Sequence, residues 1–259
     1  MILENKGINI FYTDSGKGPV IVLLHGFLED QSMWSDLVPE LTKKNRVISI
    51  DLLGHGKTGC LGYVHKMEDM ADAVYSVLKH LKLRKYTFIG HSMGGYVALA
   101  FAKLYPESIK GLCLLNSTYE ADDDQRKQLR ARANKMVQTN YENMVRMSFA
   151  NLFSAESKLK HIEAYNNALE VALKTPVQGY MAANEGMRLR EDASAFFIEA
   201  TFKKVVLLGK KDTILKSKEI LMFTKKHNIE THVFSEGHMS HIENRKNFIT
   251  EIVHFVEKI

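Results

Sequence analysis

Cysteine is scarce in this sequence, and the sequence contains no long apolar run. The two cysteines among 259 residues, Cys60 and Cys113, are too few for a disulfide framework. Cys113 lies in the apolar stretch GLCLLN, where we expect a buried and inert thiol. The longest apolar runs, such as VIVLL at residues 20–24, are far shorter than the roughly 20 residues that cross a bilayer. We therefore predict neither a disulfide-stabilised fold nor a membrane protein.

A basic run and a secretory leader are also missing from the sequence. The formal charge is +5 with a pI near 9.0, but the lysines occur in scattered pairs without interleaved aromatic residues. This pattern is typical of solvated faces and argues against nucleic-acid binding. The stretch MILENKGINIFYTDSGKG lacks the basic head, apolar stretch and cleavage site of a signal peptide. We expect a soluble, cytoplasmic protein.

What the chain does contain is an alternation of strand and helix patterns, as expected for a single large α/β domain. Buried strands are predicted at residues 20–24, 46–50, 86–89, 109–115, 204–209 and 229–234. Helices are predicted at residues 33–43, 66–81, 92–104, 215–226 and 244–257. This order favours a parallel sheet with helices on both faces. The alternating stretch GINIFYTDSG near the start suits an antiparallel edge strand.

The middle of the chain has a different pattern. Strand signals vanish between residues 118 and 200, and apolar residues recur at helical spacing, as in Met136-Val137, Tyr141 and Met144-Val145. We predict an α/β core formed by residues 1–117 and 201–259, with residues 118–200 inserted as a helical cap. The cap is expected over the carboxyl ends of the strands.

The stretch FIGHSMGGYVALAFA, residues 88–102, carries the strongest chemical signal. An apolar strand runs into Gly90-His91-Ser92-Met93-Gly94, and a helix follows directly. This is the G-x-S-x-G nucleophile elbow in its strand–turn–helix setting. The turn is so tight that side chains two residues before and after the serine would collide, which explains the two glycines. The helix N-terminus also favours a developing negative charge beside Ser92.

A second stretch, VIVLLHGFLEDQSMWSDLVPELTKKNRVISIDLLGHGKT at residues 20–58, closely resembles the N-terminal half of the α/β-hydrolase superfamily. The resemblance implies an eight-stranded, mostly parallel sheet and a Ser–His–acid site. It also implies that the backbone N–H groups of Phe27 and Met93 form the oxyanion hole. His91 is expected to pack rather than act as a base, because it points away from the serine.

The family order of Ser, then acid, then His along the chain points to Asp212 as the acid. Asp212 follows the strand in VVLLGKKDTIL, which matches the family's strand–G-x-x-D pattern. The rival position, after the preceding strand, is occupied by Asn116, and Asp122 to Asp124 lie further on. Three acidic residues in a row are usually a solvated loop or the start of a helix. Asp212 is the better candidate.

The segment EGHMSHIE, residues 236–243, offers two histidines for the base. The family's base follows a glycine in the loop after the last strand, and Gly237-His238 matches this pattern, whereas His241 leads into the final helix. A metal site built from His238, His241 and Glu243 would need a rigid helix beneath both histidines, and Gly237 argues against one. We predict His238 as the base, with no metal and no cofactor.

The expected activity is that of a serine hydrolase that cleaves small carboxylic esters, lactones or thioesters through an acyl-enzyme. One alternative uses the same triad for C–C bond hydrolysis, a lyase reaction, perhydrolysis or aminopeptidase chemistry. A second alternative is a ligand-binding member of the fold with little or no turnover. Five methionines of the predicted cap either line an apolar pocket or pack the helices together: Met136, Met144, Met147, Met181 and Met187. Six arginines there either bind an acidic substrate or face water: Arg126, Arg130, Arg132, Arg146, Arg188 and Arg190.

Overall fold

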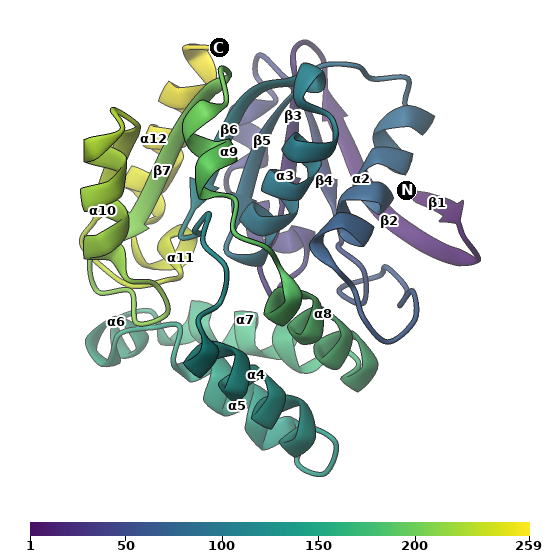
Figure 1. Cartoon of the computed structure of the whole chain (residues 1–259), viewed down its shortest axis with the longest axis vertical. Coiled ribbons are helices and arrows are strands. Elements are labelled where there is room, and N and C mark those ends of the chain that lie inside the picture. Colours follow the sequence, from purple (N-terminus) through teal and green to yellow (C-terminus); the bar gives the residue numbers. More distant parts are fainter.

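The computed structural model describes residues 1–259, except for the side chain of Ala155. Eight strands form one sheet in the order β1-β2-β4-β3-β5-β6-β7-β8 (Figure 1). They are β1 (Ile2–Asn5), β2 (Ile8–Gly16), β3 (Val20–Leu24), β4 (Arg46–Ile50), β5 (Tyr86–His91), β6 (Ile109–Leu115), β7 (Lys203–Gly209) and β8 (Glu230–Phe234). All neighbours from β4 to β8 are parallel, so the predicted eight-stranded, mostly parallel sheet is confirmed.

The amino-terminal edge of the sheet differs from the prediction in one respect. The stretch GINIFYTDSG forms β2, which is antiparallel to its neighbours as expected but is not the edge strand. The edge is β1, joined to β2 by a two-residue turn at Lys6 and Gly7 with φ of 52° and 77°. Two positive φ values are characteristic of the tight hairpin turn that matches the strand twist.

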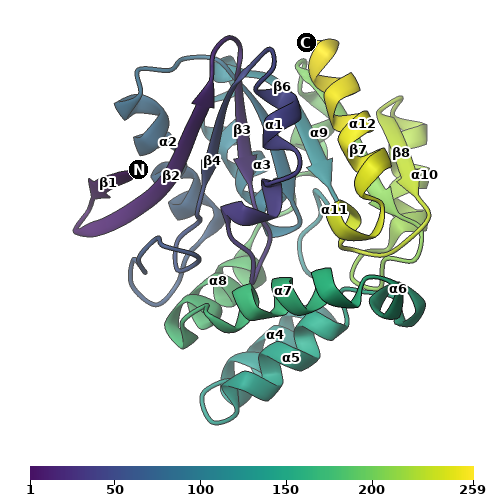
Figure 2. The same ribbon diagram turned by 180° about the vertical axis from the view of Figure 1, so that it is seen from behind.

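Helices cover both faces of the sheet. One face carries α2 (Met67–His80), α3 (Met93–Leu104), α9 (Ser194–Glu199) and α10 (Ser217–Lys226) (Figure 1). The other face carries α1 (Val38–Leu41) and α12 (Arg245–Glu257), which are in front in Figure 2. A short helix, α11 (Ser240–Glu243), precedes α12, and a 3₁₀ turn, η2 (Pro106–Ser108), precedes β6. Because the central strands are apolar on both sides, each face buries its own layer of core residues.

The predicted helix at residues 33–43 is wrong as a continuous element. The segment divides into a 3₁₀ turn, η1 (Gln31–Trp34), and the four-residue α1. Pro39 has no N–H to donate to the carbonyl group four residues earlier, so a helix cannot run through it without losing that bond. Trp34 is nevertheless fully buried and packs 6.3 Å, ring to ring, from Phe248 of α12.

Five of the six helices between β6 and β7 form a separate layer, which we call the inserted helices (Figures 1 and 2). They are α4 (Asp124–Met136), α5 (Tyr141–Ala150), α6 (Ala155–Lys160), α7 (Ile162–Leu173) and α8 (Val177–Leu189). Apolar side chains from these helices share a third core with Leu28, which follows β3, and Met239, which precedes α11. The helices therefore pack on loops that follow the carboxyl ends of the strands. The core and cap boundaries at residues 118 and 200 stay a prediction.

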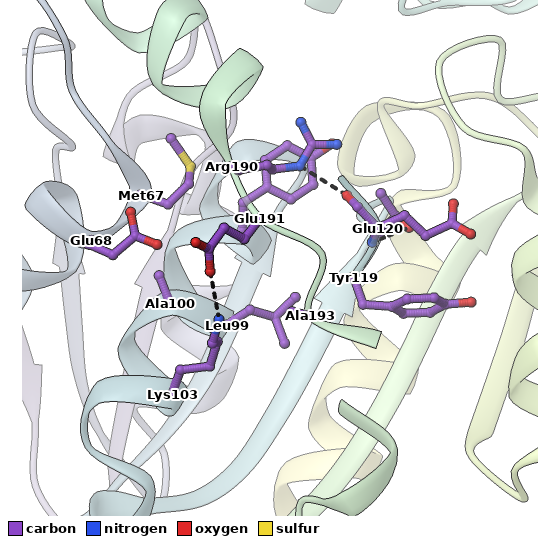
Figure 3. A pocket seen from close by; sticks show the side chains of 12 residues that line it. Met67, Glu68, Leu99, Ala100, Lys103, Tyr119, Glu120, Arg190, Glu191 and Ala193 are labelled. Carbon is purple, nitrogen blue, oxygen red and sulfur yellow. Dashed lines mark hydrogen bonds and ion pairs between the residues drawn. The ribbon is translucent and has the colours of Figure 1, made fainter. Parts of the chain in front are cut away.

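The chain enters and leaves the inserted helices through two adjacent segments, residues 119–122 and 190–193, which we call the neck. The N–H of Ala193 donates to the carbonyl oxygen of Tyr119 at 2.8 Å, and Arg190 Nε donates to that of Glu120 at 3.1 Å (Figure 3). Asp122 is buried and pairs with both Arg130 and Arg190. The cavity drawn in Figure 3 beside the neck holds about 20 Å³, room for about one water molecule.

No helix in the described part of the chain is both long enough and apolar enough to cross a membrane.

Candidate active site

Ser92 lies at the sharp turn between β5 and α3. Its φ of 47° and ψ of −113° are strained for a residue with a side chain. The turn is held by β6 and the residues that follow it: the Ser92 N–H donates to the Leu115 carbonyl oxygen at 2.9 Å, and Ser117 Oγ donates to the Ser92 carbonyl oxygen at 2.7 Å. Strain that the surroundings enforce in this way is typical of functional sites.

The two glycines of the elbow are required by close contacts. A Cβ atom on Gly90 would lie 2.5 Å from the backbone of Gly94, and one on Gly94 would lie 2.2 Å from the Leu24 carbonyl oxygen. The steric reason that we inferred for the G-x-S-x-G pattern is therefore present. The same packing buries His91 and Met93 and leaves Ser92 partly exposed between them.

His238 and Asp212 form a buried pair. Nδ1 of His238 lies 2.7 Å from Oδ2 of Asp212, and Oδ1 of Asp212 accepts the N–H groups of Ile214 and Leu215 at 2.7 and 3.0 Å. Burial raises the pKa of the Asp212 carboxyl, but His238 and these N–H groups outweigh it and hold that pKa below its usual value of 3.8. Because an ionised carboxylate only accepts, Nδ1 of His238 carries a proton, and Nε2 is left as the basic nitrogen.

Asn116, which occupies the rival acid position, supports this pair. Its Nδ2 atom donates to Asp212 Oδ2 at 3.2 Å and to the Gly237 carbonyl oxygen at 3.3 Å. Its Oδ1 atom accepts from Ser240 Oγ at 2.7 Å. The amide thus connects the loop that carries Asp212 with the loop that carries His238. Sequence reasoning considered this position only as a possible acid.

The turn from Gly26 to Glu29 presents the backbone of Phe27. The Glu29 N–H donates to the Gly26 carbonyl oxygen at 3.3 Å, and the Gly26 N–H donates to Glu29 Oε2 at 2.7 Å. Leu28 has a φ of 65°, which sharpens the turn. Among the described residues, the Phe27 N–H has no hydrogen-bond acceptor. Met93 is the first residue of α3, so its N–H has no intrahelical acceptor.

His91 forms a buried ion pair with Glu29 beneath this site. Its Nδ1 lies 2.6 Å from Glu29 Oε2, and its Nε2 lies 3.0 Å from the His238 carbonyl oxygen. Burial raises the pKa of Glu29, but His91 more than offsets this and lowers it to about 2. Both partners of the ring are then pure acceptors, so both ring nitrogens carry a proton and His91 is an imidazolium. Consistently, burial lowers the pKa of His91, yet the Glu29 carboxylate outweighs burial and the net shift is upward.

His241 lies beside this pair. Its Nε2 is 3.7 Å from Glu29 Oε1, and Glu29, His91 and His241 offer ligand atoms within 4.8 Å of one another. Among the described residues, these three, rather than His238, His241 and Glu243, are the group that could hold a metal ion. A metal would first have to displace the proton shared by Glu29 and His91. The hydrogen bond between Glu29 and His91 therefore favours the ion pair over a metal centre. The pKa of His241 is lowered to about 4, and burial is the largest cause.

Ser92 and His238 line one cavity of about 260 Å³ that extends under α4, α5 and α8. Phe27, Met239 and Tyr180 of α8 also line it, and the rings of Phe27 and Tyr180 are 4.9 Å apart. The three side chains predicted for catalysis thus lie together: two face the cavity, and Asp212 stands behind His238.

The methionines and arginines of the inserted helices divide between the cavity and other tasks. Of the five methionines, Met187 lines the cavity, whereas Met136 and Met147 are exposed. Arg126 and Arg130 line it as well. The remaining arginines pair within their helix, face solvent or join the neck: Arg146 with Glu142, Arg188 with Glu185, the exposed Arg132, and Arg190 with Asp122.

A family model described as the alpha/beta hydrolase fold matches residues 19–245. The chain belongs to the α/β-hydrolase family. This confirms the resemblance seen in the sequence and gives the sheet, the elbow and the loops after β7 and β8 their family context.

Three known proteins show how this α/β-hydrolase compares with others. The structure of a thermophilic esterase from Thermogutta terrifontis with malate bound has a TM-score of 0.92 and 28% identity, covering 99% of this chain and 96% of that one. The enol-lactonase from Burkholderia xenovorans also has a TM-score of 0.92, at 20% identity, covering 99% of this chain and 100% of that one. At 20% identity, the likeness to the enol-lactonase is evidence for the fold only and not for the activity.

Among curated relatives, the dihydrolipoyllysine-residue acetyltransferase component of an acetoin cleaving system from Pseudomonas putida is 28% identical over 253 residues. The match covers 93% of this chain and 64% of the relative. The chain therefore spans less than two thirds of that protein's length.

Sequence reasoning missed the Glu29–His91 pair. The two residues are separated by 62 positions and come from different strand ends. One signal was available in the sequence. Glu29 ends the stretch HGFLE and His91 lies in GHSMG, and the family resemblance places both stretches at the site.

Proposed function

We propose that this α/β-hydrolase cleaves small carboxylic esters, lactones or thioesters through Ser92, His238 and Asp212. The observation that carries the proposal is the common cavity: the strained serine and the histidine bound to a buried carboxylate both face it. The serine has the backbone strain of a nucleophile elbow, and the histidine has its Nδ1 proton fixed by Asp212. The similarity to a thermophilic esterase at 28% identity also supports hydrolysis of an ester.

In the first half of the reaction, Nε2 of His238 takes the hydroxyl proton of Ser92 as Oγ bonds to the substrate carbonyl carbon. The resulting imidazolium is stabilised by Asp212, and the tetrahedral oxyanion accepts the N–H groups of Phe27 and Met93. Each such donor contributes about 2.7–4 kcal/mol of transition-state stabilisation. The ester C–O bond then breaks, and His238 passes its proton to the leaving alcohol.

In the second half, a water molecule attacks the acyl-enzyme while His238 takes one of its protons. The second tetrahedral intermediate collapses, the bond to Ser92 Oγ breaks, and His238 returns the proton to the serine. The products are a carboxylic acid and the free enzyme. The Glu29–His91 pair binds the His238 carbonyl group and the Gly26 N–H and so holds both in place.

A chain-length series of p-nitrophenyl esters tests the proposal. We expect turnover of short acyl chains, declining as the chain outgrows a cavity of about 260 Å³. Ser92→Ala should abolish this turnover, and a fluorophosphonate probe should label the parent protein once, at Ser92. Probe labelling of Ser92→Ala at the parent level would disprove the assignment. A parent protein with no more turnover than Ser92→Ala would instead indicate a ligand-binding member of the fold.

A further inference from the structure

Arg126 brings a positive charge to the cavity without a matching carboxylate. It lies in the first turns of α4, is half-buried, and donates from Nη2 to the carbonyl oxygen of Ile214. Among the side chains that the structure describes, no carboxylate forms a salt bridge with its guanidinium. The nearby Asp123 instead accepts the Arg126 backbone N–H at 2.9 Å and faces Lys216 at 3.6 Å.

The other charges that line the cavity are already balanced or add to the positive side. Glu29 is balanced by the His91 imidazolium. Arg130 shares the buried Asp122 with Arg190, so one carboxylate serves two guanidinium groups. Arginine stays protonated in proteins. The described residues around the cavity therefore have an excess of positive charge. Of the two arginines that line the cavity, Arg126 makes fewer side-chain hydrogen bonds and ion pairs than Arg130.

A guanidinium in this position is suited to a carboxylate. Its planar N–H groups match the two oxygens of a carboxylate, and such charge-assisted pairs are about twice as strong as neutral hydrogen bonds. Because Arg126 is half-buried against a cavity of about 260 Å³, its ligand would be the end of a small molecule rather than an extended surface.

We propose that the substrate is an anionic ester, with a free carboxylate bound by Arg126 and its ester carbonyl at Ser92. This inference rests on the proposed function and adds the substrate class. Arg126 is bonded to Ile214, two residues beyond Asp212, so the carboxylate binds on the side of the acid loop. Leu129, Ala133 and Met187 supply an apolar lining for the carbon chain between the two groups.

The test compares anionic and neutral esters of equal length. One series comprises monomethyl esters of succinate, glutarate and adipate, with methyl esters of the matching fatty acids as neutral partners. A second series carries the carboxylate in the alcohol half, as acetyl esters of hydroxy acids with neutral acetyl esters as partners. In at least one series we expect kcat/KM for the anionic ester to exceed that of its partner by roughly ten- to hundredfold, the range of a hydrogen bond to a charged group.

Substitution at Arg126 makes the test specific. Arg126→Gln should bring the ratio of anionic to neutral kcat/KM close to one, mainly through a higher KM for the anionic ester, and Arg126→Lys should restore part of it. Arg132→Gln, which removes an exposed arginine of the same helix, should leave the ratio unchanged. A ratio near one in the parent protein for both series, or a ratio that Arg126→Gln does not lower, would overturn the inference.

A binding measurement separates this inference from the proposed function. If neither neutral nor anionic esters are hydrolysed, the proposed function fails, but glutarate binding can still be measured calorimetrically with Ser92→Ala. Glutarate should bind this variant and should bind Ser92→Ala/Arg126→Gln at least tenfold more weakly. Equal affinity would reject Arg126 as the carboxylate site even where esters are hydrolysed.

Discussion

The ring of His91 donates a hydrogen bond to the carbonyl oxygen of His238 across 3.0 Å. Through its other nitrogen, His91 is bound to Glu29, which in turn accepts the Gly26 N–H. One buried ion pair therefore connects the loop of the proposed base with the turn that presents the Phe27 N–H. This connection gives the pair a measurable effect on stability and its pH dependence.

Glu29→Gln should destabilise the fold by about 3–5 kcal/mol, because it leaves the His91 imidazolium buried without its partner. The pKa of His91 is raised and that of Glu29 is lowered in the folded state, so the pair stabilises fully between the ordinary glutamate value of 4.5 and the ordinary histidine value of 6.5. Its effect is lost as pH rises through the folded pKa of His91. Unfolding followed by circular dichroism from pH 6 to pH 10 should show this alkaline loss in the parent protein and not in the variant. Equal pH slopes would contradict the prediction. The exposed Glu142→Gln, a partner of Arg146, is the control and should change stability by less than about 0.5 kcal/mol.

The two histidines of EGHMSHIE should respond in opposite ways. His238→Ala should abolish ester turnover with little change in melting temperature. His241→Ala should retain much activity and cost about 0.5–3 kcal/mol of stability, the usual range for point changes. A chelator should affect neither activity nor stability. Loss of activity on chelation, or equal inactivation by both substitutions, would revive a metal centre, with Glu29, His91 and His241 as its ligands.

His241 should also contribute to acid denaturation. Its pKa is lowered from 6.5 to about 4 in the folded state, so the unfolded chain binds the proton more readily. Stability that depends on the neutral ring is complete above pH 6.5 and is lost as pH falls toward 4, by up to about 3 kcal/mol. Urea unfolding at pH 7 and pH 5 should show a smaller difference for His241→Gln than for the parent protein. An unchanged difference would mean that other groups govern this pH range.

The two candidate acids should be separable by what their loss affects. Asp212→Asn should leave the fold intact and cut turnover by orders of magnitude, as the equivalent change does in a well-studied serine protease, where the loss is on the order of 10⁴. Asp122→Asn should instead destabilise the protein by about 3–5 kcal/mol, because Arg130 and Arg190 then lose their shared buried partner. Measuring kcat of both variants at a temperature where both are folded shows which carboxylate is needed for turnover. A larger loss of kcat in Asp122→Asn than in Asp212→Asn would move the acid to the other loop.

The sequence predicts best what depends on neighbouring residues. The strand at 20–24, the strand at 46–50 and the elbow around Ser92 each follow from a run of apolar residues with a turn signal next to it. The family pattern adds positions that depend on chain order, and these lead to Asp212 and His238, which the structure brings within 2.7 Å. Their catalytic roles stay a prediction until the variants are measured.

The features that the sequence does not predict depend on contacts between distant segments or on one backbone position. The helical spacing of apolar residues at 33–43 predicts a buried face, but it takes no account of Pro39, which lacks the N–H that a continuous helix would need there. Nothing near Glu29 indicates a partner in the elbow, and nothing near Asn116 indicates that its amide joins two loops from later in the chain. Such pairings arise only when strand ends meet at one edge of the sheet.

The neck has an implication for how this chain can change over evolutionary time. One backbone hydrogen bond, from Ala193 to Tyr119, and the bonds of the Arg190 side chain to Glu120 and Asp122 hold residues 119–122 and 190–193 side by side. The two ends of the intervening stretch therefore have a constant separation. A different set of helices with the same two ends could replace α4–α8 without altering the strands that carry Ser92 and Asp212. Exchange of these helices would then change the residues that line the cavity, while the proposed catalytic residues on the strand ends stay in place.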